Sequence, residues 1–152
     1  MTIDTMHRVT GRLLPVDHDD RVLLLHGFDP ARPDQPFWFT VGGAVDPGES
    51  TAQAAAREAF EETGLVVSAN LLGEAAWSSS TTFSFDGRQV HQTMDFFVAR
   101  VAPFEVTFAG HDEVERGCVD GHGWWSLDEL RTTDERYIPE DLPARLGAAL
   151  TA

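Results

Sequence analysis

The segment from Gly43 to Leu65 constrains the fold more than any other part of this chain. It reads GAVDPGESTAQAAAREAFEETGL and places glutamates at positions 58, 61 and 62. At about 100° per residue, these three side chains fall within an arc of roughly 100° on one helix face. Small and apolar residues collect on the other side: Ala52, Ala55, Ala56, Ala59 and Phe60. The segment therefore predicts a helix with one face for packing and one face of carboxylates.

Local signals at both ends support this helix. Ser50 and Gln53 have the spacing of a capping box, which predicts that the helix begins just after Glu49. Gly64 stands where a left-handed residue would end it. The residues before the helix are those of a tight strand-to-helix connection: Gly42, Gly43, Asp46, Pro47 and Gly48.

The carboxylate face needs a physical reason, because like charges at this spacing cost a helix a few tenths of a kcal/mol per pair. One interpretation is a solvated acidic surface. The other is a site for a hard divalent cation such as Mg²⁺, which prefers oxygen ligands and shares itself with substrate phosphates. An open row of carboxylates suits such an ion better than a closed cage does.

The segment resembles the Nudix box, in which glycine, glutamate and an Arg-Glu-aliphatic-any-Glu-Glu-any-Gly-aliphatic run recur at fixed spacing. The matching residues here are Gly43, Glu49, Arg57, Glu58, Glu61, Glu62, Gly64 and Leu65. Two positions depart from the pattern. Ala59 stands where a larger aliphatic residue is common, and Val41 precedes the two glycines where relatives often carry proline.

The resemblance implies a fold class of α/β, a Nudix-type α/β/α sandwich around a mixed β-sheet, formed by a single domain over residues 1–152. Softer similarities lie upstream, in FWFTVGGAVDPGE, and downstream, in GWWSLDEL. The length suits one domain with its own core.

Hydrophobic patterning places further elements along the chain. We expect strands at Arg8–Val16, Arg21–Leu25, Phe37–Val41, Glu74–Phe85, Gln89–Val101 and Trp124–Ser126. Asp86-Gly87 is a hairpin signal. We expect a helix from about Leu127 and a last helix over Pro139–Leu150, with loops at Asp29–Gln35 and Ala109–Cys118.

Enzymes that resemble this chain hydrolyse a pyrophosphate bond in a nucleoside diphosphate linked to another group. They use Mg²⁺, with Mn²⁺ as a substitute, and a metal-activated water. The resemblance implies metal ligands at Glu58, Glu61 and Glu62, of which Glu62 is the first choice and Glu61 the third. Glu49 would support the site directly or through water, and Arg57 would orient a glutamate. The Gly42 carbonyl would lie near the metal.

The general base stays open between three residues. In relatives it is often a glutamate from a loop upstream of the GWWSLDEL-like segment. Glu115 occupies the matching region, Glu113 competes with it, and Glu58 could itself be the base.

Composition excludes several function classes. The formal net charge of −14 argues against a nucleic-acid polymer as partner, because phosphate backbones are held by basic patches. No apolar run at the N-terminus or elsewhere predicts a secretory signal or a membrane span. Cys118 is the single cysteine, so a reducing cytoplasm is the expected location. Lysine is absent, which rules out a lysine nucleophile.

Other functions on the same fold stay open as alternatives. One is a non-catalytic nucleotide-binding or regulatory module, although such proteins tend to lose box glutamates. Another is an isomerase, which often needs a reactive cysteine. The sequence leaves the substrate-binding residues and the diphosphate substrate undetermined. The aromatic residues that flank the site are Phe37, Trp38 and Phe39, and those that could line a base pocket are Trp77, Trp124 and Trp125, although most of them are expected in the core. Relatives are often dimers, so a homodimer is a further expectation.

Overall fold

A computed structural model of the chain describes residues 5–152. In chain order the elements are β1 (Thr5–Val16), β2 (Val22–Asp29), β3 (Arg32–Ala44), α1 (Thr51–Thr63), the 3₁₀ turn η1 (Ala69–Leu71), β4 (Trp77–Phe85), β5 (Arg88–Arg100), α2 (Glu113–Cys118), β6 (Val119–Trp125), α3 (Leu127–Thr132), β7 (Tyr137–Ile138) and α4 (Leu142–Thr151). The first four residues belong to the stretch considered above for a secretory signal, and they lie outside the described part.

The strands form one mixed sheet in the order β4-β5-β1-β2-β3-β7, and β6 pairs with β2. β1 runs parallel to β5 from Thr5↔Gln89 to Val16↔Arg100, whereas β4–β5 and β2–β3 are antiparallel hairpins. β3 also reaches β1, where Gly11 lies opposite Gly43 and Arg12 lies opposite Gly42. The end of β3 that leads into the box therefore lies beside the middle of the sheet.

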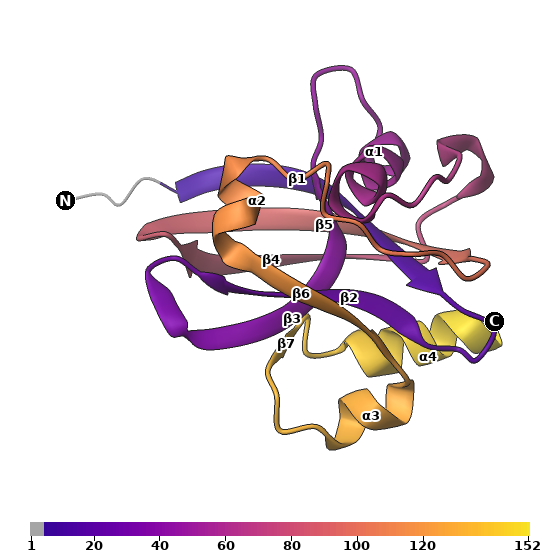
Figure 1. Cartoon of the computed structure of the whole chain (residues 1–152). Helices are drawn as coiled ribbons and strands as arrows, with labels where there is room; N and C mark the ends of the chain where they lie inside the picture. Colours follow the sequence, from indigo (N-terminus) through magenta and orange to yellow (C-terminus); the bar gives the residue numbers. More distant parts are fainter. Residues whose placement is uncertain (1–4) are drawn as a thin grey trace.

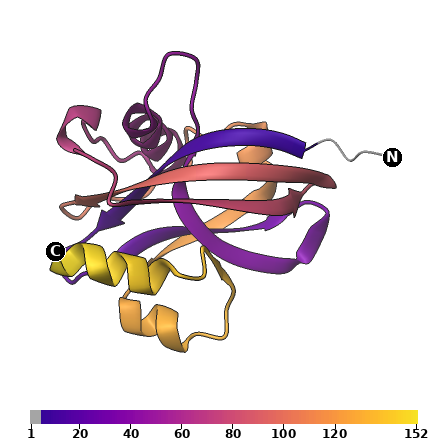
Figure 2. The same ribbon diagram turned by 180° about the vertical axis from the view of Figure 1, so that it is seen from behind.

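Helices cover both faces of this sheet, as the two opposite views show (Figures 1 and 2). α1 packs against β1 and β3, while α3 and α4 lie on the other side. This arrangement confirms the predicted α/β/α sandwich around a mixed sheet.

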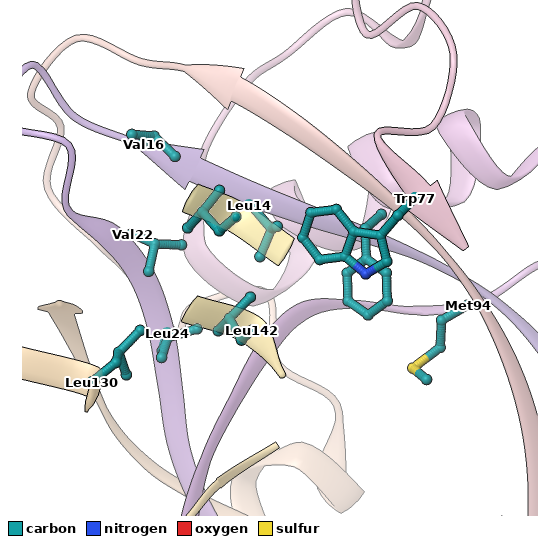
Figure 3. Close-up of a cluster of buried hydrophobic side chains, with 10 residues drawn as sticks. Leu14, Val16, Val22, Leu24, Trp77, Met94, Leu130 and Leu142 are labelled. Carbon is teal, nitrogen blue, oxygen red and sulfur yellow. The ribbon is translucent and has the colours of Figure 1, made fainter. Parts of the chain in front are cut away.

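Alternate residues of the central strands fill two cores. The core under α3 and α4 contains Leu14, Val16, Val22, Leu24, Trp77, Met94, Phe96, Leu130, Leu142 and Leu146, most of which Figure 3 labels. The core under α1 contains Leu13, Leu23, Leu25, Val41, Ala55, Ala59, Leu65 and Phe97. The continuous LLL run of β2 thus serves both faces, because successive strand residues point to opposite sides.

The predicted loop at Asp29–Gln35 is wrong. β2 continues to Asp29 and β3 begins at Arg32, so a short turn joins two long strands. The paired register jumps from Gly27↔Phe37 to Asp29↔Arg32, and residues 32–36 are exposed. Proline is tolerated there because the irregular, solvent-facing stretch makes few ladder hydrogen bonds.

Other boundaries also differ from the sequence prediction, among them the start of β1, which is Thr5 instead of Arg8, and the start of α4, which is Leu142 instead of Pro139. β4 begins at Trp77 instead of Glu74, and β6 is the whole of Val119–Trp125 instead of Trp124–Ser126. The glycines of VDGHGWW hid the strand, since glycine is depleted in strands. The segment Ala109–Cys118 also ends in a short helix, α2. No helix among the described residues is long and apolar enough to cross a membrane.

We predict that Gly11→Ala destabilises the fold, because α1 lies directly on this glycine of β1. A Cβ atom at Gly11 would lie 1.9 Å from the carbonyl oxygen of Thr51, which is backbone and cannot rotate away. Overpacking of this kind costs about 1–3 kcal/mol or more. Urea unfolding measures the loss. Gly117→Ala is the matched control, since its Cβ would meet nothing within 4 Å, and an equal effect in both variants would contradict the close approach of α1.

Candidate functional site

The helix α1 begins and ends where its capping residues predict. The Ser50 side chain accepts a hydrogen bond from the Gln53 amide at 3.1 Å, and the Gln53 side chain accepts one from the Ser50 amide at 2.8 Å. Gly64 ends the helix with a φ of 79°, and its N–H bonds the Phe60 carbonyl at 2.9 Å. These caps fix which side chains of α1 face the end of β3.

Two glycines let this helix approach β3 closely. Gly42 has a φ of 139°, a conformation that favours glycine, and a Cβ there would lie 2.2 Å from the carbonyl oxygen of Gly11. A Cβ at Gly43 would lie 2.6 Å from the carboxyl carbon of Glu58. Gly43 therefore makes the space that the Glu58 carboxylate occupies, whereas Gly42 lets β3 lie close to β1.

Three carboxylates meet beside this glycine pair. Oxygen atoms of Glu58, Glu62 and Glu115 all lie within 4.8 Å of one another. Glu62 is 5% exposed and accepts a hydrogen bond of 2.7 Å from the Gly42 amide. Glu58 comes from the same face of α1, whereas Glu115 comes from α2, more than fifty residues later. We call this group the carboxylate cluster.

Burial makes the cluster unfavourable as three free anions. Desolvation raises the pKa of Glu62 well above its usual range, although the Gly42 amide works in the opposite direction. Desolvation also raises the pKa of Glu58, and the charges of Glu61 and Glu115 add to the effect. Oxygen donors that converge in this way fit a divalent cation. The cation would compensate the negative charge of carboxylates that burial removes from water.

Arg57 organises the carboxylates around the cluster. Its guanidinium donates two bonds to Glu49, at 2.8 and 2.9 Å, and one to Glu58 at 2.9 Å. It also donates to the Ala44 carbonyl at 2.9 Å. The bidentate bond to Arg57 lowers the pKa of Glu49, and the same bond raises the pKa of Arg57. Glu49 is thus held as an anion that positions Arg57.

Glu61 lies outside the carboxylate cluster. Its carboxylate accepts a hydrogen bond of 3.2 Å from Arg57, and its side chain is 41% exposed. Of the three glutamates expected on this helix face, the structure brings together two, and it supplies the third carboxylate from α2.

The segment before α2 holds Glu115 in place. Asp112 caps α2 by accepting from the Glu115 amide at 2.8 Å, and Glu115 accepts from the Asp112 amide at 3.2 Å. His111 is 4% exposed and its Nε2 lies 2.8 Å from the Glu62 carbonyl, to which it donates. Glu113 points to solvent and is not part of the cluster. This segment therefore links the α2 carboxylate to the backbone of α1.

Sequence reasoning missed two features of this site. His111 had no metal-ligand spacing to mark it, and its role depends on a backbone carbonyl that only the fold brings near. The Asp112-x-x-Glu115 capping box was visible in the sequence and could have predicted α2.

A cavity of about 350 Å³ lies along β3 from the cluster. It is lined by His26, Gln35, Pro36, Trp38, Asp134, Glu135 and Arg136. The Trp38 ring packs 4.7 Å from the His26 ring, and its Nε1 donates to Glu135 at 3.3 Å. Trp38 lies four residues before Gly42, roughly 13 Å along a strand. An aromatic wall with polar neighbours is typical of a small-molecule site.

We predict that Glu62→Gln stabilises the metal-free protein. Glutamine keeps an acceptor for the Gly42 amide but removes a buried charge, so the free energy of unfolding at pH 7 in chelator should rise by about 1 kcal/mol. Guanidinium unfolding measures it. The control is Glu74→Gln at an exposed position, where we expect a change within about 0.5 kcal/mol. A less stable Glu62→Gln protein would show that the carboxylate is not strained by burial.

We predict that His111→Ala loosens α2. The change removes the bond to the Glu62 carbonyl and the stacking of His111 on Phe108, whose ring lies 4.4 Å away. The expected loss of stability is about 1–3 kcal/mol. Hydrogen exchange should rise over residues 107–118 before it rises in β1. His18→Ala is the control, because its side chain is 73% exposed, and equal exchange in the two variants would contradict the link.

Comparisons with known proteins identify the family of this chain. The sequence model for the NUDIX domain matches residues 6–144. A Bacillus subtilis (strain 168) protein, named provisionally as an 8-oxo-dGTP diphosphatase, is 61% identical over 33 residues. That match spans 22% of this chain and 22% of the relative.

Two solved structures share the fold. The crystal structure of the MutT protein from Methanosarcina mazei Go1 superposes with a TM-score of 0.67 at 20% identity, covering 99% of this chain and 97% of that one. An Ap4A hydrolase from C. elegans gives a TM-score of 0.63 at 21% identity, covering 95% and 98%. Since the family match takes in nearly all of the described sheet and helices, the chain belongs to the Nudix hydrolase family.

Proposed function

We propose that this protein hydrolyses a pyrophosphate bond in a nucleoside diphosphate linked to another group, with Mg²⁺ as its cofactor and Mn²⁺ as a substitute. The observation that carries the proposal is the carboxylate cluster of Glu58, Glu62 and Glu115, built on the Nudix box and half-buried beside Gly42.

Glu62 and Glu58 would hold the metal, because burial makes them the carboxylates that gain most from a cation. Glu61 is the weakest of the three box ligands, since Arg57 already engages its more exposed side chain. A bound Mg²⁺ ion supplies Lewis-acid stabilisation of phosphate oxygens and lowers the pKa of a bound water. Arg57 and Glu49 act by holding Glu58 in position.

Glu115 is the general base in this proposal. Glu58 is already hydrogen-bonded to Arg57, which favours its charged form, and Glu113 points to solvent. Glu115 takes a proton from the water that attacks one phosphorus, the bridging P–O bond breaks, and the other phosphate group leaves with the bonding electrons. Glu115 then returns its proton to solvent, so the carboxylate is regenerated.

A nucleotide substrate fits the surroundings of the cluster. The spacing between Trp38 and Gly42 on β3, roughly 13 Å, is similar to the reach of a nucleoside diphosphate from its base to its outer phosphate. The cavity at Trp38 offers an aromatic ring on which a nucleobase could stack and carboxylates that could accept its hydrogen bonds. The names of the relatives, an 8-oxo-dGTP diphosphatase and an Ap4A hydrolase, share a nucleoside attached to phosphoanhydrides.

The alternatives receive less support. A non-catalytic module would have no need of a clustered Glu58, Glu62 and Glu115. An isomerase would need a reactive thiol, but burial, followed by the charge of Glu115, raises the pKa of Cys118. The lone cysteine is also the basis for proposing a cytoplasmic location, and a homodimer stays a prediction.

The experiment is a panel of nucleoside triphosphates, nucleotide sugars, ADP-ribose and dinucleoside polyphosphates, each incubated with Mg²⁺ or Mn²⁺ and separated by chromatography. We expect one class to release a nucleotide and phosphate or pyrophosphate only when metal is present. No turnover of any compound would contradict the proposal and favour a binding module.

The same assay separates the two acids of α2. We predict that Glu115→Gln lowers kcat by about 10²–10⁴-fold, the usual contribution of a general base, whereas the neighbouring Glu113→Gln changes kcat by less than about threefold. Circular dichroism checks that both variants are folded. The reverse order of effects would assign the base to Glu113.

A further inference from the structure

Arg12 and the buried Glu62 of the carboxylate cluster both hydrogen-bond to the backbone of Gly42. β1 places it directly across from Gly42 in the sheet. Its guanidinium donates to the carbonyl oxygens of Thr40 and Gly42, at 3.3 and 3.2 Å. Glu62 accepts from the amide of the same glycine. The backbone of Gly42 therefore bonds both the Arg12 guanidinium and Glu62, the most deeply buried carboxylate of the site.

No ion pair balances this cation within the part of the chain that the structure describes. Each of its acceptors is neutral: besides the two carbonyls, Nε donates to the Thr10 hydroxyl at 3.3 Å and NH2 donates to the Gln92 side chain at 3.3 Å. No carboxylate of residues 5–152 lies within 4.0 Å of it. Arg12 is half-buried, and a guanidinium removed in part from water without an anionic partner is costly to keep.

Arg12 stays charged despite this environment. Burial lowers its pKa to about 10, and the charges of Glu62 and Glu58 work against that lowering. At neutral pH the side chain is a cation. A guanidinium also has five N–H groups, of which the four bonds above engage four. One N–H is left for a further acceptor.

We propose that Arg12 binds the substrate's diphosphate, donating its remaining N–H to a non-bridging phosphate oxygen while Glu58 and Glu62 hold the metal. The inference rests on the proposed function and adds a residue to it. A guanidinium binds phosphate as well as carboxylate, and a substrate phosphate would reach this position together with the metal. The substrate thus supplies the anionic partner that Arg12 lacks among residues 5–152.

A purely structural role for Arg12 is the competing explanation, since its bonds to Thr40 and Gly42 also brace the end of β3. The two roles differ in what they change. Bracing affects the free energy of unfolding and the affinity for metal alone. Phosphate binding affects the affinity for a diphosphate when the metal is already bound.

The test uses the full chain with three variants: Arg12→Met, Arg12→Lys and the control Arg145→Met. Arg145 lies on α4 and pairs with Asp141 at the surface. Calorimetry measures Mg²⁺ alone, and then inorganic pyrophosphate at saturating Mg²⁺. Loss of a charged hydrogen bond predicts that Arg12→Met binds pyrophosphate about 10–100-fold more weakly, with affinity for Mg²⁺ alone within twofold of wild type. Arg145→Met should match wild type in both titrations.

Turnover of the substrate identified by the panel gives a second readout. Arg12→Met should lower kcat/KM by about the same 10–100-fold, and Arg12→Lys should recover part of it because the charge remains. Unchanged pyrophosphate affinity in Arg12→Met, or equal losses for pyrophosphate and for Mg²⁺ alone, would overturn the proposal. If Arg12→Met does not fold, Arg12→Lys decides: weakening of at least threefold supports phosphate binding, and wild-type affinity overturns it.

This design separates the inference from the proposed function. A wild-type protein that hydrolyses nothing would contradict the proposed function, while the pyrophosphate titrations would still test Arg12. An active wild type whose Arg12→Met variant binds pyrophosphate normally would contradict only the role of Arg12.

Discussion

The hydrogen bond from the Gly42 amide to the Glu62 carboxylate is the interaction on which the rest of the site depends. It joins the end of β3 to the last turn of α1 and fixes a carboxylate that is 5% exposed. The approach requires two glycines, because a side chain at Gly42 or Gly43 would collide with β1 or with Glu58. The Nudix box thus supplies packing as well as ligands. Its glycines let β3 lie close to β1 and to the Glu58 carboxylate.

The buried carboxylates of the site lower the stability of the metal-free protein although the proposed function needs them. Burial raises the pKa of Glu62 and Glu58, so the folded protein holds these carboxylates at a cost. Arg57 offsets part of it through Glu58 and Glu49, but no cation of the described residues pairs with Glu62. Proteins tolerate such strain where a ligand relieves it. At Gly42 a cation that has no anionic partner among residues 5–152 lies near a crowded set of anions, an arrangement that metal and phosphate together would balance.

How much of this could be predicted from the sequence depended on whether a contact was local. The helix α1, its caps and its glycine turn follow from spacing within twenty residues, and the structure has them where the sequence placed them. Glu115 is different: its neighbours Glu58 and Glu62 are more than fifty residues away in the sequence, and only the tertiary fold brings the three carboxylates together. His111 and Arg12 are harder still, because they act on backbone atoms, which leave no pattern of residue types. The loop predicted at Asp29–Gln35 failed for a related reason, since proline signals a turn without indicating whether the strand continues around it.

Arg12 shows how register in a sheet can assign chemistry that a motif does not contain. Its position opposite Gly42 is set by the pairing of β1 with β3, and that pairing in turn requires Gly11 and Gly43 to lie face to face beneath α1. A shift of one residue would move Arg12 to the other face of the sheet, among the apolar side chains that pack under α1. The same register of β1 against β3 therefore positions both α1, which carries Glu58 and Glu62, and Arg12. A substitution that shifts this register should displace both. The Glu62 carboxylate and the Arg12 guanidinium both bind the backbone of Gly42, so the end of β3 holds the anion and the cation of the site close to each other.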